Sequence, residues 1–167
     1  MLKFPIKKTR TSKCYAEEYL STLSEVSKKI DFNTIEKLSK LISRYYLSNK
    51  NIFVCGNGGS ASISNHFICD HLKGTSSNTN LLPKIFSLSS SLEIVTAVAN
   101  DIKYDEIFSF QLSRLARRGD CLITISSSGN SENIINAIKW GKKNELKTVS
   151  LNGFDGGRAK KISDISI

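Results

Sequence analysis

Three glycines and a serine follow a strand-like apolar run in the first half of the chain, in the segment Gly56-Asn57-Gly58-Gly59-Ser60. Glycine lacks a Cβ, so the backbone of such a loop can approach a ligand closely and adopt positive φ angles. A helix beginning near Ser60 would present free N–H groups and the positive end of its dipole, which suits an anion. The segment therefore predicts an anion-binding loop. The simpler interpretation is a tight strand–helix turn, for which one glycine would suffice.

Nucleotide binding fits this loop less well. Gly56-x-Gly58-x-x-Ala61 loosely matches the dinucleotide fingerprint, which also needs an acidic residue about 20 positions on, at the end of the second strand. The second strand-like run ends instead in SLSS (87–90), without an acid. No lysine follows Gly59, as a P-loop would require. We therefore expect no nucleotide cofactor.

A second loop, SSSGNS (126–131), places four hydroxyl groups around another strand-to-helix turn, on Ser126, Ser127, Ser128 and Ser131. A phosphate monoester has three strong acceptor oxygens and nearly two negative charges at neutral pH. Hydroxyls and helix N-terminal amides can satisfy these oxygens without a lysine. Alternatively, this is a polar loop in which Ser131 caps the helix. Because two such loops follow strands, a phosphate cradle is the favoured interpretation.

His66 and Asp70 lie four residues apart on a predicted helix and therefore share one face, whereas His71 lies on another. A histidine and a carboxylate at this spacing can bind a metal or share proton-transfer work. The alternative is an ordinary pair on a helix surface.

The elements that must position these residues follow from apolar spacing. Two helices are predicted over 13–31 and from about 33 to 47, the second with a capping-box pattern at Asn33 and Glu36. The chain then alternates between strands at 51–56, 84–90, 120–126, 147–153 and from 164, and helices at 60–73, 91–99, 104–117 and 131–144. This alternation predicts an α/β fold: a doubly wound, Rossmann-like or flavodoxin-like parallel sheet of five strands flanked by helices. Ligands bind beyond the carboxyl ends of such strands, where both loops lie.

Three parts follow along the chain: a mobile basic arm (1–12), two N-terminal helices (13–50) and the α/β domain (51–167). A strand at the very end without a covering helix leaves one face of the sheet exposed. We therefore expect a terminal helix that is missing from this chain or supplied by a partner subunit.

The composition is that of an ordinary globular protein of 167 residues, 40% hydrophobic and 23% charged. No apolar run approaches the roughly 18 residues that span a bilayer, and the N-terminus does not have the pattern of a signal peptide. We expect a cytoplasmic protein without a membrane partner. The cysteines Cys14, Cys55, Cys69 and Cys121 form no CxxC pair, and we interpret Cys55 and Cys121 as small buried hydrophobes.

The net charge of +9 raises the alternative of nucleic-acid binding, with five basic residues within 1–13. However, no RNA- or DNA-binding motif is present and no aromatic platform is interleaved with basic residues. We expect no nucleic-acid partner. A steep loss of affinity with salt would indicate one.

Taken together, four blocks resemble the phosphoheptose isomerases, which carry a SIS domain: CGNGGSAS…NHF…D…LKG, VANDIKYDEIFS, GDCLITISSSGNSENI and LNGFDGGR. They occur in the same order over residues 35–167. The resemblance implies a SIS domain that binds a sugar phosphate. It further implies an aldose–ketose isomerase that converts sedoheptulose 7-phosphate to glycero-manno-heptose 7-phosphate for bacterial surface polysaccharide. Members are tetramers, often with zinc.

The resemblance also assigns roles to residues. Substrate contacts are implied for Asn57, Gly58, Gly59, Asn100 and Asp101, and phosphate contacts for Ser126, Ser127, Ser128 and Ser131. His66 aligns with a zinc ligand of the family. Asp70 stands where the family has a glutamate that is both ligand and general base.

Two departures from the family pattern bear on catalysis. Asp70 is one methylene shorter than glutamate, which retracts its carboxylate by about 1.5 Å, and displacements near 1 Å can cost about a hundredfold in rate. The family's later glutamine and histidine lie on a C-terminal helix, and this sequence ends before it. The expected zinc site of His66 and Asp70 is therefore incomplete.

Two other functions remain open. One is a non-catalytic SIS module that binds or senses a phosphosugar. The other is an isomerase for a different phosphosugar, with a preference set by the loop 73–83.

Overall fold

The structure, a computed structural model, describes residues 11–167 and is built on one parallel sheet. Its strands are β1 (Ile52–Gly56), β2 (Ile85–Ser87), β3 (Cys121–Ser126), β4 (Lys147–Asn152) and β5 (Ile165–Ser166). They pair in the order β2-β1-β3-β4-β5, all parallel. The predicted doubly wound, five-stranded α/β fold is confirmed. The order reverses between β1 and β3, the point where such sheets place ligands.

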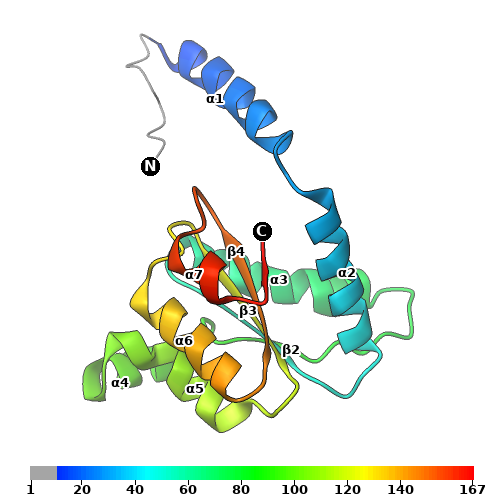
Figure 1. Ribbon diagram of the computed structural model, residues 1–167, viewed down its shortest axis with the longest axis vertical. Coiled ribbons are helices and arrows are strands. Elements are labelled where there is room, and N and C mark those ends of the chain that lie inside the picture. The colour runs from blue at the N-terminus through cyan, green and yellow to red at the C-terminus, as the bar shows by residue number, and fades with distance from the viewer. Residues whose placement is uncertain (1–10) are drawn as a thin grey trace.

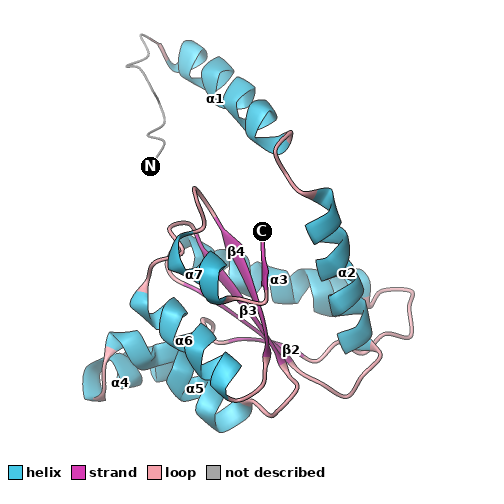
Figure 2. Cartoon of the chain, in the orientation of Figure 1, coloured by secondary structure: helices cyan, strands magenta, loops and turns pink. Residues whose placement is uncertain are grey.

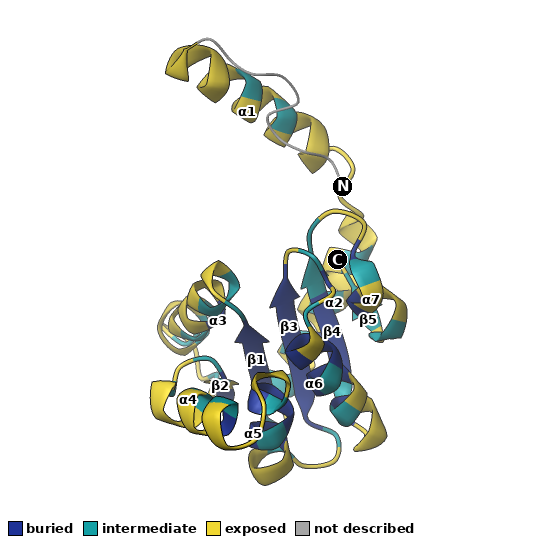
Figure 3. Ribbon diagram, turned by 90° about the vertical axis from the view of Figure 1, so that its left-hand side faces the viewer, coloured by how far each residue is buried: buried dark blue, intermediate teal, exposed yellow. Residues whose placement is uncertain are grey.

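Helices cover both faces of the sheet (Figures 1 and 2). One face carries α4 (Leu92–Asp101), α5 (Ile107–Leu115), α6 (Glu132–Lys143) and α7 (Gly157–Ile162), and the other carries α2 (Phe32–Tyr46) and α3 (Gly59–Cys69). Successive strand side chains point to opposite faces, so Phe53 and Cys55 join the first core while Ile52 and Val54 join the second. Both layers exclude solvent, and Figure 3 shows the strands as the buried centre.

The first helix, α1 (Ser12–Ser27), has no buried side chain and projects away from the sheet (Figure 1). It ends four residues earlier than predicted. Thr11 is its N-cap: the hydroxyl accepts a hydrogen bond from the N–H of Cys14 (3.2 Å). Residues 11 and 12 of the predicted arm therefore belong to the helix, and residues 1–10 lie outside the described part of the chain.

Several local predictions were wrong. Asp31, not Asn33, caps α2, and its carboxylate accepts from the N–H of Asn33 (3.0 Å). The predicted helix 60–73 stops at Cys69 and continues as a π-helix, Asp70–Thr75. The predicted helix 104–117 divides into a 3₁₀ turn, Tyr104–Glu106, and α5. The short α7 was missed because it follows a glycine pair and shows no apolar periodicity.

The interpretation of two cysteines is confirmed. Cys55 and Cys121 are buried in strands. Burial raises the pKa of both thiols, that of Cys121 to about 12, so both remain protonated and pack as apolar groups. Within residues 11–167, no helix is long and apolar enough to cross a bilayer.

Asp164, which directly precedes β5, joins this strand to β4 through hydrogen bonds of its side chain. Its carboxylate accepts hydrogen bonds from the N–H and hydroxyl of Thr148 (both 2.9 Å) and from Lys142 (3.0 Å). Its side chain is 25% exposed. Burial alone would raise the pKa of Asp164, but the hydrogen bonds from Thr148 and Lys142 outweigh it and hold the pKa below its ordinary value.

We expect Asp164→Asn to lower the free energy of unfolding at pH 7 by about 1 kcal/mol, after allowing for solvent screening. Because the folded-state pKa is lowered, this stability is present above the unfolded-state pKa of about 3.9 and is lost as pH falls through the folded value. Urea denaturation from pH 7 to pH 3 should therefore show the two proteins converging below about pH 4. A gap of unchanged size at pH 3 would contradict the role of the charge.

Candidate functional site

The glycine loop and the serine loop lie side by side at the carboxyl edge of the sheet. Gly56 at the end of β1 pairs in register with Ile125 of β3, and Ser126 follows directly. The loops also sit at the reversal of strand order, so the sheet brings the two predicted anion-binding segments to one place.

The glycine loop needs its glycines at two positions. Gly58 has φ +54° and precedes the first turn of α3. A Cβ on Gly56 would lie 2.6 Å from the carbonyl oxygen of Ser60, so any side chain there would force the loop open. The loop therefore turns tightly into α3, whose N-terminus faces the edge of the sheet.

The serine loop encloses a cavity of about 100 Å³. The cavity is lined by Asn57, Ser60, Ile125, Ser126, Ser127, Ser128 and Ser131. Within residues 11–167, Ser126 and Ser128 use their hydroxyls to accept from the loop N–H groups of Gly129 and Asn130 (3.1 and 3.2 Å). Ser131 occupies the N-cap position of α6 but makes no capping hydrogen bond with its side chain.

Three hydroxyls of this cavity make no hydrogen bond within the described chain, and those of Ser126 and Ser128, which only accept, can still donate to a ligand. Among the hydrogen bonds of residues 11–167, none involves the side chains of Ser60, Ser127 or Ser131. Such hydroxyls can donate to phosphate oxygens together with the first N–H groups of α6. The alternative interpretation of Ser131 as a simple helix cap is wrong for its side chain.

The loop after β4 and the start of α7 are hydrogen-bonded to the backbone of the serine loop. The N–H of Gly153 donates to Ser127 O (3.0 Å), and the N–H of Ala159 donates to Gly129 O (2.9 Å). Gly129 has φ +63°, and a Cβ there would collide with the carbonyl oxygen of Gly156. In LNGFDGGR itself, a Cβ on Gly153 or Gly157 would meet the carbonyl oxygen of Ser127 or Ser128, which explains these two glycines.

Electrostatics near the serine loop are balanced rather than strongly positive. Arg158 pairs with Glu132, the first residue of α6. The hydrogen bond from Arg158 lowers the pKa of the Glu132 carboxyl. The arginine therefore neutralises an acid that would otherwise oppose an anion at the start of α6.

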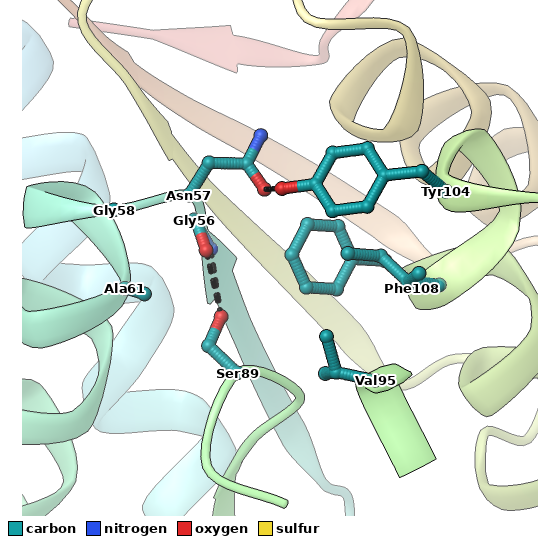
Figure 4. Close-up of a pocket in the computed structure, with 9 residues that line it drawn as sticks. Gly56, Asn57, Gly58, Ala61, Ser89, Val95, Tyr104 and Phe108 are labelled. Carbon is teal, nitrogen blue, oxygen red and sulfur yellow. Dashed lines mark hydrogen bonds between the residues drawn. The ribbon is translucent and has the colours of Figure 1, made fainter. Parts of the chain in front are cut away.

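A second cavity of about 110 Å³ lies beside the first (Figure 4). It is lined by Gly56, Asn57, Gly58, Ala61, Ser89, Val95, Tyr104, Ile107 and Phe108. Ser89 closes one side by exchanging hydrogen bonds with the N–H and carbonyl of Gly56 (3.1 and 2.9 Å). Sequence analysis missed Ser89 and Tyr104, although both fall in polar blocks next to strands or helices.

His66 and Asp70 are paired but exposed. The Nε2 of His66 lies 3.4 Å from Oδ1 of Asp70, and their side chains are 74% and 64% exposed. Neither lines the two cavities. In the described part of the chain, no group of three or more His, Cys, Asp or Glu side chains could hold a metal ion. Two donors do not complete a tetrahedral zinc site, so these residues alone do not fit zinc.

A polar contact secures the start of the π-helix that carries Asp70. Tyr46 of α2 is hydrogen-bonded to Nδ1 of His71, whose ring lies 4.1 Å from that of Phe67. Burial lowers the pKa of His71, so this ring is neutral at pH 7 and packs against α2.

The remaining predicted contacts lie apart from the cavities. Asn100 and Asp101 are exposed at the end of α4, where the amide of Asn100 donates to Asp101 (2.8 Å). Neither residue lines either cavity.

The chain matches known proteins over most of its length. The sequence model of the SIS domain family matches residues 14–153. A phosphoheptose isomerase from Aliarcobacter butzleri is 37% identical over 153 residues, which cover 90% of this chain and 80% of that protein. The chain belongs to the phosphoheptose isomerase family of SIS-domain proteins.

Solved structures of phosphoheptose isomerases share this fold. The one from Francisella tularensis matches with a TM-score of 0.81 at 28% identity and covers 93% of this chain and 84% of its own. The one from Neisseria gonorrhoeae gives 0.78 at 29% identity, with 92% and 81% covered. The resemblance read from the sequence blocks is confirmed.

We expect Gly129→Ala to disrupt phosphate binding in this isomerase-family fold, because the added Cβ meets Gly156 and the positive φ disfavours alanine. Binding of inorganic phosphate, measured by calorimetry, should weaken at least tenfold. Gly74→Ala is the matched control, since a Cβ at Gly74 meets nothing within 4 Å. Normal binding by the Gly129 variant would show that this backbone contact does not shape the phosphate cradle.

Proposed function

We propose that this protein is an aldose–ketose isomerase that converts sedoheptulose 7-phosphate to glycero-manno-heptose 7-phosphate. The observation that carries the proposal is the serine-lined cavity at the strand reversal, with available hydroxyls on Ser60, Ser127 and Ser131, in a chain of this family. A phosphate held there would be gripped by Ser126, Ser127, Ser128 and Ser131, with Asn57, Gly58 and Gly59 beside it.

The reaction moves a proton between adjacent carbons through an enediol. It needs a base at carbon, an acid at the carbonyl oxygen and stabilisation of the developing oxyanion. We assign the base to Asp70. His66, paired with it at 3.4 Å, would polarise the oxygen.

The length of α3 is compatible with this assignment. At 1.5 Å per residue, His66 and Asp70 lie about 9 and 15 Å along the helix axis from Ser60. The six C–C bonds of a heptose span roughly 8 Å when extended, and the phosphoester adds to this length. An extended heptose phosphate held in the serine cavity therefore reaches about the level of His66, whose Nε2 lies 3.4 Å from the Asp70 carboxylate, whereas a triose phosphate is too short.

Zinc is part of the proposal only through His66 and Asp70, as two donors of a set completed from outside residues 11–167 or by water. A bound zinc ion would supply Lewis-acid polarisation of a substrate oxygen. Asn100 and Asp101 would contact substrate only if a ligand or a second subunit extended the site toward α4. A cytoplasmic location and a place in surface-polysaccharide synthesis belong to the same proposal.

A non-catalytic phosphosugar-binding module is the second candidate. The observation that favours it is the exposed Asp70, one methylene shorter than the family's glutamate. Isomerisation of another phosphosugar, selected by the loop 73–83, is a third. Both share the phosphate cradle and differ in what happens at carbons 1 and 2.

We expect proton exchange at carbons 1 and 2 of sedoheptulose 7-phosphate, followed by NMR in heavy water with and without zinc, and we expect Asp70→Asn to abolish it. The variant should still bind inorganic phosphate, because Asp70 does not line the serine cavity. Glu93→Gln on exposed α4 is the control for loss of one carboxylate. Exchange retained by Asp70→Asn would remove Asp70 as the base. Binding without exchange in the unmodified protein would favour the module.

We also propose a homo-oligomer, a tetramer as in the family, joined through α1. Tyr19, Leu23 and Val26 of α1 follow each other at spacings of four and three, as in the seam of a coiled coil. Leu23 and Val26 are each 52% exposed in the single chain. An apolar seam of this kind on a projecting helix is stabilised when another helix covers it.

We expect Leu23→Glu with Val26→Glu to reduce the mass measured by light scattering from that of an oligomer to that of a monomer. Glu17→Gln with Glu18→Gln, on the same helix, provides a control that should leave the mass unchanged. A monomeric unmodified protein, or an oligomer that survives the apolar substitutions, would contradict assembly through α1.

A further inference from the structure

Asn57 separates the two cavities and lines both of them. Its side chain comes from the loop after β1, between the serine cavity and the more apolar cavity of Figure 4. A ligand whose phosphate lies among the serines must pass this amide, so the direction in which the amide points affects how the rest of the ligand lies.

The amide of Asn57 forms a reciprocal pair with Asn133. Nδ2 of Asn57 donates to Oδ1 of Asn133 (2.8 Å), and Nδ2 of Asn133 donates to Oδ1 of Asn57 (3.0 Å). Asn133 is 1% exposed, so water cannot replace these bonds. A buried amide without partners is costly, which strongly favours this orientation of Asn57.

Tyr104 adds a third bond to the same amide. Its hydroxyl donates to Oδ1 of Asn57 (3.1 Å), which saturates that oxygen and leaves one N–H of Asn57 outside these bonds. Figure 4 shows the Tyr104 ring directed at Asn57 beside the ring of Phe108. Phe108 is 1% exposed, whereas Tyr104 is 53% exposed. The tyrosine hydroxyl therefore reaches the site from a side chain that is not needed to fill the core.

Helix α6 contacts or adjoins the elements that position the serine loop, Asn57 and Tyr104. Asn133 and Asn136 lie one turn apart on α6 and share a face. Asn136 donates to the carbonyl of Asp105 and to the carboxylate of Glu106 (both 3.2 Å), which holds the turn that carries Tyr104. Because α6 begins directly after Ser131, the serine loop, Asn57 and Tyr104 are connected through the same helix.

We infer that Tyr104 is a positioning residue for the reaction: its hydroxyl keeps the Asn57 amide turned so that the remaining N–H faces the sugar chain of a phosphate-anchored ligand. This inference rests on the proposed function and deepens it. Asn57 contacts the ligand, and Tyr104 acts through Asn57. Phosphate affinity comes from the serine loop, so it does not depend on Tyr104.

The test is Tyr104→Phe, which removes the hydroxyl and keeps the ring. The two bonds between Asn57 and Asn133 remain, so the fold and the serine cavity should persist. Losing the neutral hydrogen bond through which Tyr104 orients the Asn57 amide should lower kcat at least fivefold, because the sugar chain is then less well placed. Affinity for inorganic phosphate should stay within twofold, while affinity for sedoheptulose 7-phosphate falls.

Tyr45→Phe is the matched control. The Tyr45 hydroxyl donates to the carbonyl of Gly119 (3.0 Å) at the opposite edge of the sheet. This variant should lower the melting temperature without changing kcat or either affinity. A structural role for Tyr104 would produce the same pattern as Tyr45, so the selective loss for sugar phosphate over phosphate separates the two roles.

The outcomes distinguish this inference from the proposed function. If the unmodified protein binds the sugar phosphate without proton exchange, the isomerase proposal fails. The role of Tyr104 can then still be tested by comparing the ratio of sugar-phosphate to phosphate affinity in Tyr104→Phe with that of the unmodified protein. An unchanged ratio and an unchanged kcat in Tyr104→Phe would overturn the inference while leaving the isomerase intact. An unmodified protein that binds neither ligand would overturn both.

Discussion

Because all five strands run parallel, every strand ends at the same edge of the sheet, and the residues that follow them meet there. The crossover from β1 to β2 goes to one side and the next strand, β3, is added on the other, so the loops after β1 and β3 diverge and leave a space between them. Both cavities of the candidate site depend on that reversal. The loop after β4 adds a backbone wall, since Gly129 and Gly156 approach too closely for any side chain.

In the proposed site, an anion would be held by hydrogen bonds rather than by net charge. Arg158, whose backbone N–H donates to Asn130 of the serine loop (3.0 Å), is paired with Glu132, and Lys142 and Lys147 are paired with Asp164. The charge of +9 therefore does not by itself explain phosphate binding. Hydroxyls and helix N–H groups define the direction of each phosphate oxygen more closely than a mobile lysine would, which matters when the reacting carbons lie several bonds away.

Sequence patterns predicted the fold and the two loops because these depend on local signals: apolar runs, glycines and clustered serines. They did not predict the Asn57–Asn133 pair or the hydrogen bond from Tyr104 to Asn57, which join residues 76 and 47 positions apart. A single asparagine or tyrosine has no periodicity, so only the three-dimensional arrangement distinguishes it from a surface residue. The π-helix that begins at Asp70 was missed for a related reason. His71 in this segment contacts Tyr46 and Phe67, and the sequence of 60–75 has no pattern that indicates a change from α-helix to π-helix.

The exposure of His66 and Asp70 constrains how the proposed chemistry can operate. General acid–base groups act more effectively when solvent is excluded, because their electrostatic interactions strengthen in a less polar medium. In a single chain these side chains are 74% and 64% exposed, and the same helical segment exposes Ile63 and Leu72 at 57% and 50%. Apolar side chains next to a polar pair favour a covering surface. Ile63 lies one and two turns before His66 and Asp70 and shares their face. A second subunit that covered Ile63 would also dehydrate the histidine and the aspartate, and in that case assembly and the proposed catalysis would be physically linked.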